Sequence, residues 1–269
     1  MYHTALIGPS PRISVDYCGD GELVICLHGI GGNKRNWHGN LEVFGTSFHA
    51  VAWDARGYGE SEDYEGPLEF SSFAHDVARV LDYFETDMAH IIGLSMGGRI
   101  AGFFHRLYPK RVKSLVLCDT HLGFEAFTPQ ERQEFVRLRK EPLLNGKEPK
   151  DIAPVVAATL IGDPANTLAF ERLVDSMSRL HKESYIKTIE SSVNLDHADL
   201  FSGVDVPTLV MVGELDTLTT PVMAKRIADK IKNAELVTIP AAGHLVNIEQ
   251  PEVFNQVVLD FLKRQATDR

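Results

Sequence analysis

The chain has 269 residues, of which 44% are hydrophobic and 24% charged, and its formal net charge is -10. This composition is typical of a globular protein with a large core, and it excludes collagen-like, low-complexity and disordered classes. The negative charge disfavours nucleic acid or an anionic membrane surface as a partner, because phosphates would be repelled.

The N-terminal sequence and the cysteines indicate where in the cell the protein is located. The first residues contain no basic segment followed by a long apolar stretch, so a signal peptide is not expected, and no apolar run is long enough to span a membrane. Cys18, Cys26 and Cys118 are odd in number and form no C-x-x-C pair. Thiols in this pattern fit a reducing compartment better than a disulfide framework or a zinc site. We therefore expect a cytoplasmic protein.

Short apolar runs rich in β-branched residues alternate with helical patterns along the chain. The runs are nearly continuous in apolar character, which is typical of parallel strands covered on both faces. Strands are predicted at 23–27, 50–53, 91–92, 112–118, 206–212 and 235–239, and helices at 73–84, 221–231 and 253–262. This alternation predicts an α/β fold with a doubly wound, mostly parallel sheet.

One region interrupts the alternation. Helical patterns at 130–144, 152–160, 166–180 and 183–193 follow one another without a strand between them. The region is too long for a simple crossover, so we expect a helical lid over the carboxyl edge of the sheet, where ligands of open α/β sheets bind. The expected division is a core of residues 1–126 and 200–269 with a lid of residues 127–199.

A serine lies between glycines where a predicted strand passes into a predicted helix. Gly93-Leu94-Ser95-Met96-Gly97 fits G-x-S-x-G, a sharp strand-to-helix turn with strained backbone angles and small neighbours. Such a turn projects the hydroxyl above the sheet and leaves the Met96 amide at a helix N-terminus, where it can bind developing negative charge. We predict Ser95 as a nucleophile, against the alternative of a chance match in a loop.

A serine hydroxyl needs a base, and the chain has 11 histidines. His75, His105 and His181 fall in helical patterns and are expected to be surface or packing residues, while His28 is expected to brace a glycine-rich loop. His244 follows the last predicted strand, which gives the order serine, acid, histidine used by nucleophile-elbow enzymes. We predict His244 as the base.

The third member of the triad has several candidates. Asp216 and Asp119 each follow a predicted strand and would lie at the carboxyl edge of the sheet. Asp216 is favoured because its strand lies next to the loop that carries His244. Asp119 would then be a lid-hinge residue or a helix cap, and Glu214 is a weaker third candidate.

The loop His28-Gly29-Ile30-Gly31-Gly32 can supply a second oxyanion donor, and we predict that this donor is the Ile30 amide, opposite that of Met96. The loop lacks the lysine of G-x-x-x-x-G-K-[ST] and the spacing of G-x-G-x-x-G, so nucleotide binding is not expected. The sequence contains no H-E-x-x-H pattern. We therefore expect neither a metal nor a cofactor.

Together these motifs resemble the α/β-hydrolase family over nearly the whole chain. The resemblance includes the loop at His28, D-x-R-G-x-G-x-S from Asp54 to Ser61, the elbow at Ser95, G-E-L-D at Asp216 and G-H at His244. Within the family, residues 243–251, 93–98, 183–185 and 195–200 are similar to β-ketoadipate enol-lactone hydrolases. This similarity implies a serine hydrolase that cleaves a small ester or lactone through an acyl-enzyme.

Other activities on the same fold stay open. Carbon–carbon hydrolases of meta-cleavage pathways usually have asparagine before the serine and tryptophan after the histidine, where this chain has Leu94 and Leu245. A cofactor-free perhydrolase and a slow-turnover ligand receptor are further alternatives. If the substrate carries a carboxylate, a cation must bind it, and the candidates are Arg99, Arg137 and Arg139.

Overall fold

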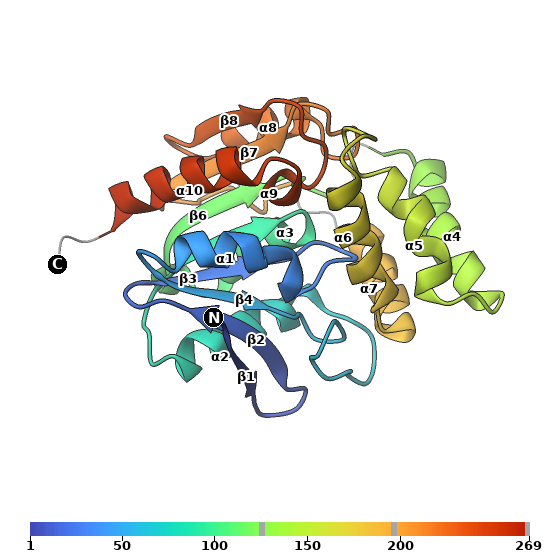
Figure 1. The fold of residues 1–269 in the computed structure, drawn as a ribbon, viewed down its shortest axis with the longest axis horizontal. Coiled ribbons are helices and arrows are strands. Elements are labelled where there is room, and N and C mark those ends of the chain that lie inside the picture. The colour runs from blue at the N-terminus through green and yellow to red at the C-terminus, as the bar shows by residue number, and fades with distance from the viewer. Residues whose placement is uncertain (124–126, 195–197, 267–269) are drawn as a thin grey trace.

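An eight-stranded sheet forms the centre of the computed structural model, which describes residues 1–123, 127–194 and 198–266 (Figure 1). The strands lie in the order β1-β2-β4-β3-β5-β6-β7-β8. The pairs β1–β2 and β2–β4 are antiparallel and the remaining pairs are parallel. The strands are β1 (His3–Ile7), β2 (Ile13–Cys18), β3 (Leu23–Leu27), β4 (His49–Trp53), β5 (Ala89–Leu94), β6 (Val112–Cys118), β7 (Thr208–Gly213) and β8 (Glu235–Ile239).

The central strands are covered on both faces, as their continuous apolar sequences predict. Every residue of β3, β5 and β7 is buried. β7 begins at Thr208, two residues later than predicted, because Pro207 has no N–H to donate to a ladder. The predicted fold class, an α/β protein with a doubly wound and mostly parallel sheet, is confirmed.

The antiparallel edge of the sheet was not predicted. β1 is exposed except at Ile7 and partly at Ala5, and the apolar pattern of β2 is interrupted by Ser14 and Asp16. These two polar side chains are nevertheless buried, because the Lys34 ammonium bonds to the Ser14 hydroxyl at 2.7 Å and lies 3.0 Å from the Asp16 carboxylate. A buried polar pair of this kind removes the periodicity on which a strand prediction depends.

Helices cover both faces of the sheet (Figure 1). α1 (His38–Phe44) and α10 (Pro251–Gln265) pack together on one face, and α2 (Phe70–Tyr83) and α3 (Met96–Leu107) pack together on the other. α8 (Pro221–Ala228) packs against β7 and β8. The short elements are η1 (Lys34–Trp37), η2 (Pro109–Arg111) and α9 (Val246–Glu249).

Among the described residues between β6 and β7 there are four helices: α4 (Pro129–Leu144), α5 (Pro149–Ala158), α6 (Thr167–Ser178) and α7 (Lys182–Asn194). We call them the helical insertion. Figure 1 shows them gathered at one side of the molecule, beyond the sheet. Their positions agree with the four helical patterns in the sequence, although residues 124–126 and 195–197 at the expected lid boundaries lie outside the described residues.

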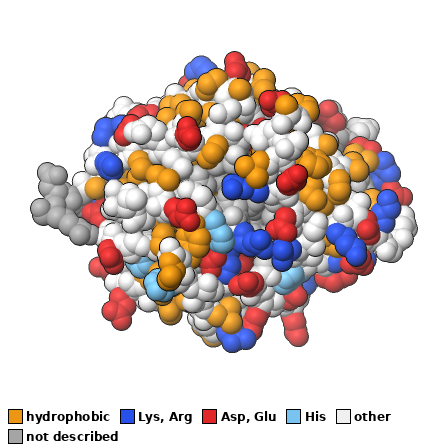
Figure 2. Space-filling view, viewed as in Figure 1, with side chains coloured by type: hydrophobic (Ala, Val, Ile, Leu, Met, Phe, Trp, Pro, Cys, Tyr) orange, Lys and Arg blue, Asp and Glu red, His pale blue; other side chains and the backbone are white. Residues whose placement is uncertain are grey.

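Charged side chains of both signs share the molecular surface. Figure 2 shows lysine and arginine scattered among aspartate and glutamate on the face in view. Within the described part of the chain, none of the helices combines the length and hydropathy that crossing a membrane requires.

Candidate active site

Ser95 lies at the turn between β5 and α3 and has φ 55° and ψ −114°. A left-handed backbone at a residue other than glycine costs on the order of 1–3 kcal/mol and persists only where its surroundings hold it. Here the Ser95 N–H donates to the Cys118 carbonyl at 2.8 Å, and the Thr120 hydroxyl donates to the Ser95 carbonyl at 2.7 Å. These bonds from the end of β6 hold the strained turn.

The glycines of the motif are required by close backbone contacts. A Cβ on Gly93 would lie 2.3 Å from the Gly97 carbonyl oxygen, and one on Gly97 would lie 2.2 Å from the Leu27 carbonyl oxygen. Backbone atoms cannot move aside as a flexible side chain can. The tight turn therefore depends on the absence of side chains at both positions.

We expect Gly93→Ala to lower the free energy of unfolding by at least about 3 kcal/mol, because the new methyl group overlaps backbone atoms. The matched control is Gly39→Ala in α1, where an added Cβ meets nothing within 4 Å. This control should change stability by less than about 1 kcal/mol. Urea unfolding followed by circular dichroism measures both. A Gly93→Ala protein as stable as the control would contradict the proposed tightness of the turn.

Three of the predicted side chains form one chain of hydrogen bonds. The His244 Nε2 atom lies 3.0 Å from the Ser95 Oγ atom, and the His244 Nδ1 atom lies 2.9 Å from the Asp216 Oδ2 atom. His244 and Asp216 are each only 4% exposed. The carboxyl ends of β5, β7 and β8 thus bring together a hydroxyl, a carboxylate and an imidazole that are far apart in the sequence.

Asp216 is held by donors of its own turn. The N–H groups of Leu218 and Thr219 donate to Oδ1 at 2.8 and 2.9 Å, and the Thr219 hydroxyl donates to Oδ2 at 2.5 Å. Burial alone would raise the pKa of Asp216, but the His244 ring and the Thr219 donors outweigh it and hold the pKa well below its usual range. The carboxylate is therefore ionised and can orient an imidazole.

The alternative acids have other partners. Asp119 is fully buried, and its Oδ1 and Oδ2 atoms accept from the N–H groups of Gly213 at 2.8 Å and Val246 at 3.4 Å. Burial, followed by the charge of Asp216, raises the pKa of Asp119 well above its usual range. Because Val246 is the first residue of α9, the Asp119 carboxylate joins the end of β7 to the N-terminus of that helix. Glu214 is exposed and accepts from the Ala241 N–H at 3.2 Å.

The loop after β3 lies against the elbow. A Cβ on Gly29 would lie 3.0 Å from the Ser95 Cβ atom. The His28 Nδ1 atom bonds to the Gly29 carbonyl at 2.8 Å and the Nε2 atom accepts from the Ala55 N–H at 3.0 Å, so this imidazole braces the loop as expected. Burial lowers the pKa of His28 to about 4, which keeps the ring neutral. The Met96 N–H is the first amide of α3 and has no acceptor within the helix.

Two cavities meet at Ser95. One has a volume of about 380 Å³ and the other about 620 Å³, and both are lined by Ile30, Ser95, Leu160 and His244. The smaller cavity also has Trp37, Leu94 and Leu245 in its wall. The larger cavity extends beneath the helical insertion and contains the basic side chains Arg99 and Arg139.

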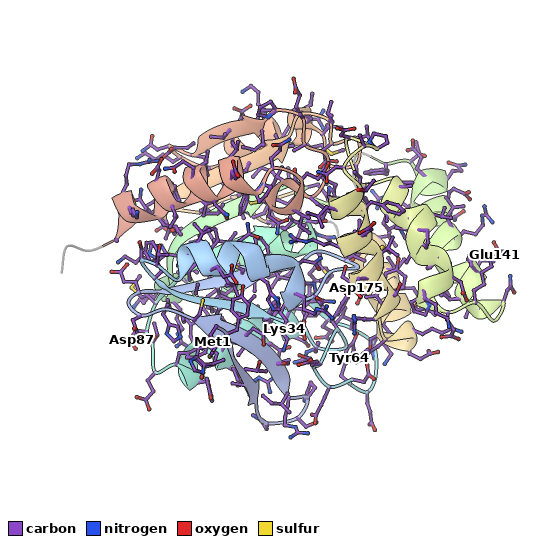
Figure 3. The ribbon with its side chains drawn as sticks, in the orientation of Figure 1. Met1, Lys34, Tyr64, Asp87, Glu141 and Asp175 are labelled. Carbon is purple, nitrogen blue, oxygen red and sulfur yellow. The ribbon has the colours of Figure 1, made fainter. Side chains whose placement is uncertain are left out.

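The three candidate arginines have different surroundings. Arg99 on α3 is 1% exposed and Arg139 on α4 is half-buried, and both line the larger cavity. Arg137 does not reach it, because residues two apart on a helix point in different directions. Its guanidinium is exposed and pairs with Glu134 at 2.7 Å and Glu141 at 2.6 Å. Figure 3 shows Glu141 at the outer end of the helical insertion.

Sequence reasoning missed several residues of this site. Thr219 could have been found from its place three residues after a strand-end aspartate, where turn donors commonly bind the carboxylate. His121 lines the larger cavity, and burial and then the charge of Arg99 lower its pKa to about 3. Tyr185 reaches the same cavity from α7, and its helical pattern gave no sign of this.

The helical insertion is bonded to the loop that carries His244. The His244 N–H donates to the Leu160 carbonyl at 2.9 Å. The buried Glu249 carboxylate accepts from Gly162 in the α5–α6 connection at 2.8 Å and from Leu245 at 3.2 Å. The position of the loop that carries His244 is therefore coupled to that of the α5–α6 connection. In the described part of the chain, no group of three or more His, Cys, Asp or Glu side chains is arranged to hold a metal ion.

Comparisons with known proteins identify the family to which this fold belongs. A family model described as the alpha/beta hydrolase fold matches residues 22–251. The chain is 25% identical over 247 residues to 3-oxoadipate enol-lactonase 2 of Acinetobacter baylyi, with 91% of this chain and 90% of that protein covered. It is 29% identical over 271 residues to a 2-hydroxy-6-oxononadienedioate/2-hydroxy-6-oxononatrienedioate hydrolase of Burkholderia vietnamiensis, with 96% and 93% covered. A malate-bound thermophilic esterase of Thermogutta terrifontis superposes with a TM-score of 0.87 at 26% identity, covering 99% of this chain and all of that one.

Proposed function

Because the chain belongs to the α/β-hydrolase family, we propose that it is a serine hydrolase that cleaves a small carboxylic ester or lactone through an acyl-enzyme. The observation that carries this proposal is the bonded chain from Ser95 Oγ through the His244 ring to Asp216. A hydroxyl within 3.0 Å of an imidazole that is itself oriented by an ionised carboxylate is the arrangement that activates serine as a nucleophile.

The proposed reaction has two halves. His244 takes the proton of Ser95 as its Oγ atom attacks the substrate carbonyl, and the Ile30 and Met96 amides donate to the resulting oxyanion. The carbonyl re-forms, and His244 gives its proton to the departing oxygen. A water molecule then attacks the acyl-enzyme, with His244 again as the base, and releases the acid and free Ser95.

The rest of the proposal follows from the surroundings of this site. The helical insertion serves as a lid that covers the two cavities, and residues 1–126 and 200–269 form the core that holds the triad.

We place the enzyme in the cytoplasm, because Cys18, Cys26 and Cys118 are free thiols and free thiols are typical of reducing compartments.

Carbon–carbon bond hydrolysis is the second candidate, favoured by the relative from Burkholderia vietnamiensis. The leucines at positions 94 and 245 favour ester or lactone cleavage instead. Both side chains line the smaller cavity beside Ser95 and His244, and neither can donate a hydrogen bond to the enolate of a vinylogous diketone.

A substrate panel tests this proposal. We expect kcat/KM for enol-lactones or activated esters to exceed that for vinylogous 1,5-diketones by at least about 100-fold, which corresponds to about 2.7 kcal/mol of transition-state stabilisation. Steady-state rates with purified protein measure the ratio. A ratio below one would instead assign the chain to carbon–carbon hydrolysis, and no turnover of any class would favour a ligand receptor.

A further inference from the structure

Arg99 is a buried cation that lacks a carboxylate partner among the described residues. Its side chain is 1% exposed, its Nη2 atom donates to the Ser192 carbonyl at 3.2 Å, and its Nε atom has no partner. The guanidinium lies 4.7 Å from the centre of the Phe70 ring. These contacts are neutral, so the full charge of Arg99 is uncompensated.

Among the described residues, the buried Lys34 and the largely buried Arg56 are paired with carboxylates. Lys34 lies 3.0 Å from Asp16 and 2.8 Å from Glu60. Arg56 donates to both oxygens of Asp76, at 2.6 and 2.7 Å. A charge removed from water without a counter-charge destabilises the protein strongly. The exception at Arg99 therefore indicates that its partner comes from outside the chain.

Arg99 faces the larger cavity together with two further donors. Arg139 of α4 stacks 3.8 Å from the centre of the Phe135 ring and donates to the Phe135 carbonyl at 3.2 Å, and it too has no carboxylate partner among the described residues. Tyr185 of α7 is 1% exposed and lines the same cavity. Two guanidinium groups and a phenol from three different helices thus surround one enclosed space.

We propose that the substrate carries a free carboxylate, and that this carboxylate binds between Arg99 and Arg139 in the larger cavity. The inference rests on the proposed function, because it takes this cavity as the substrate site. Arginine binds carboxylates through paired N–H donors, and the Nε atom of Arg99 is available for such a bond.

The position of Arg99 also limits the distance to the scissile bond. Arg99 lies four residues after Ser95, one turn along the same face of α3. The carboxylate and the attacked carbonyl must therefore be separated by only a few bonds. The substrate class is a short ester or lactone of a hydroxy acid or a dicarboxylic acid, in place of a neutral fatty ester.

Two matched pairs of substrates test whether a substrate carboxylate binds between Arg99 and Arg139. Mono-4-nitrophenyl adipate and methyl 4-nitrophenyl adipate differ in the acyl part, where one has a carboxylate and the other its neutral methyl ester. 3-Acetoxybenzoate and methyl 3-acetoxybenzoate differ in the same way in the leaving group. For at least one pair, we expect wild type to prefer the charged member. For that pair, kcat/KM for the charged substrate divided by kcat/KM for the neutral substrate should fall about 10- to 100-fold in Arg99→Met, because the substitution removes a charge-assisted bond. The same fall is expected in Arg139→Met.

Arg137→Met is the control, because Arg137 lies on the same helix as Arg139 but is exposed and paired with Glu134 and Glu141. Its ratio should equal that of wild type. Equal ratios in wild type, Arg99→Met and Arg139→Met would overturn the proposal. If Arg99→Met does not fold, Arg99→Lys takes its place, since a lysine keeps the charge but loses the paired donors.

A binding measurement separates this inference from the catalytic proposal. Calorimetry should detect adipate, but not 1,6-hexanediol, binding to Ser95→Ala, and the affinity should fall at least about 10-fold in Ser95→Ala/Arg99→Met. Absence of adipate binding together with equal substrate ratios would overturn the inference while leaving Ser95 as the nucleophile. Turnover by Ser95→Ala with intact adipate binding would overturn the catalytic proposal alone.

Discussion

Replacing Ser95 by alanine is expected to lower kcat for ester hydrolysis by about 10⁴- to 10⁶-fold, because no other group supplies the attacking oxygen. Residual turnover would come from binding and from the Ile30 and Met96 amides acting on water. KM should change little, since the substrate contacts stay in place. Stopped-flow kinetics with a 4-nitrophenyl ester should show a burst of product in wild type and none in the variant.

Covalent labelling supplies a second readout for Ser95. A fluorophosphonate should add one equivalent to wild type by mass spectrometry, at the peptide containing residue 95, and none to Ser95→Ala. The control is Ser202→Ala, where the serine is exposed on the surface, and it should label and turn over as wild type does. Wild-type activity in Ser95→Ala would reject the proposed nucleophile outright.

Asp216→Asn should lower kcat by about 10³- to 10⁴-fold with a nearly unchanged fold. An asparagine whose Oδ1 atom still accepts from the Leu218 and Thr219 N–H groups presents its NH2 group to the His244 Nδ1 atom, which favours the wrong tautomer of the ring. The negative charge that stabilises the imidazolium is lost as well. Steady-state kinetics and the thermal unfolding temperature, measured on the same preparation, separate catalysis from stability.

The matched variant is Asp119→Asn at the other buried aspartate. Its Oδ1 atom can still accept from Gly213, and neither of its two hydrogen bonds involves the His244 side chain. We expect less than about a tenfold loss of kcat from this change. A larger loss in Asp119→Asn than in Asp216→Asn would transfer the role of catalytic acid to Asp119.

Local sequence determines the elbow, and for this reason it could be predicted. The contact that requires glycine at position 93 is with Gly97, within the same five-residue motif, and the apolar run of β5 leads directly into it. The same holds for His244, whose place after the last strand follows from chain order. Neither prediction needed information about which distant segments touch.

The parts of the site that could not be predicted depend on contacts between distant segments. Whether Arg137 or Arg139 points into the larger cavity depends on how α4 is rotated against α7, and the helical patterns of the two do not determine it. The burial of Asp16 beside Lys34 likewise depends on a contact between β2 and η1. Such contacts are tertiary, and the propensities of a short window do not contain them.

The bond between Glu249 and Gly162 has a consequence for entry to the cavities. The α5–α6 connection cannot swing away without breaking the contacts of the loop that carries His244. α7 is attached to the core as well, through hydrogen bonds from Ser184 to Asp63 and from Ser191 to the Leu68 carbonyl. α4, which buries only Leu143, is joined in turn to α7 by the ion pair of Lys140 with Glu190. Because Arg139 lies on α4, any displacement of this helix would also change the position of a guanidinium group in the wall of the larger cavity.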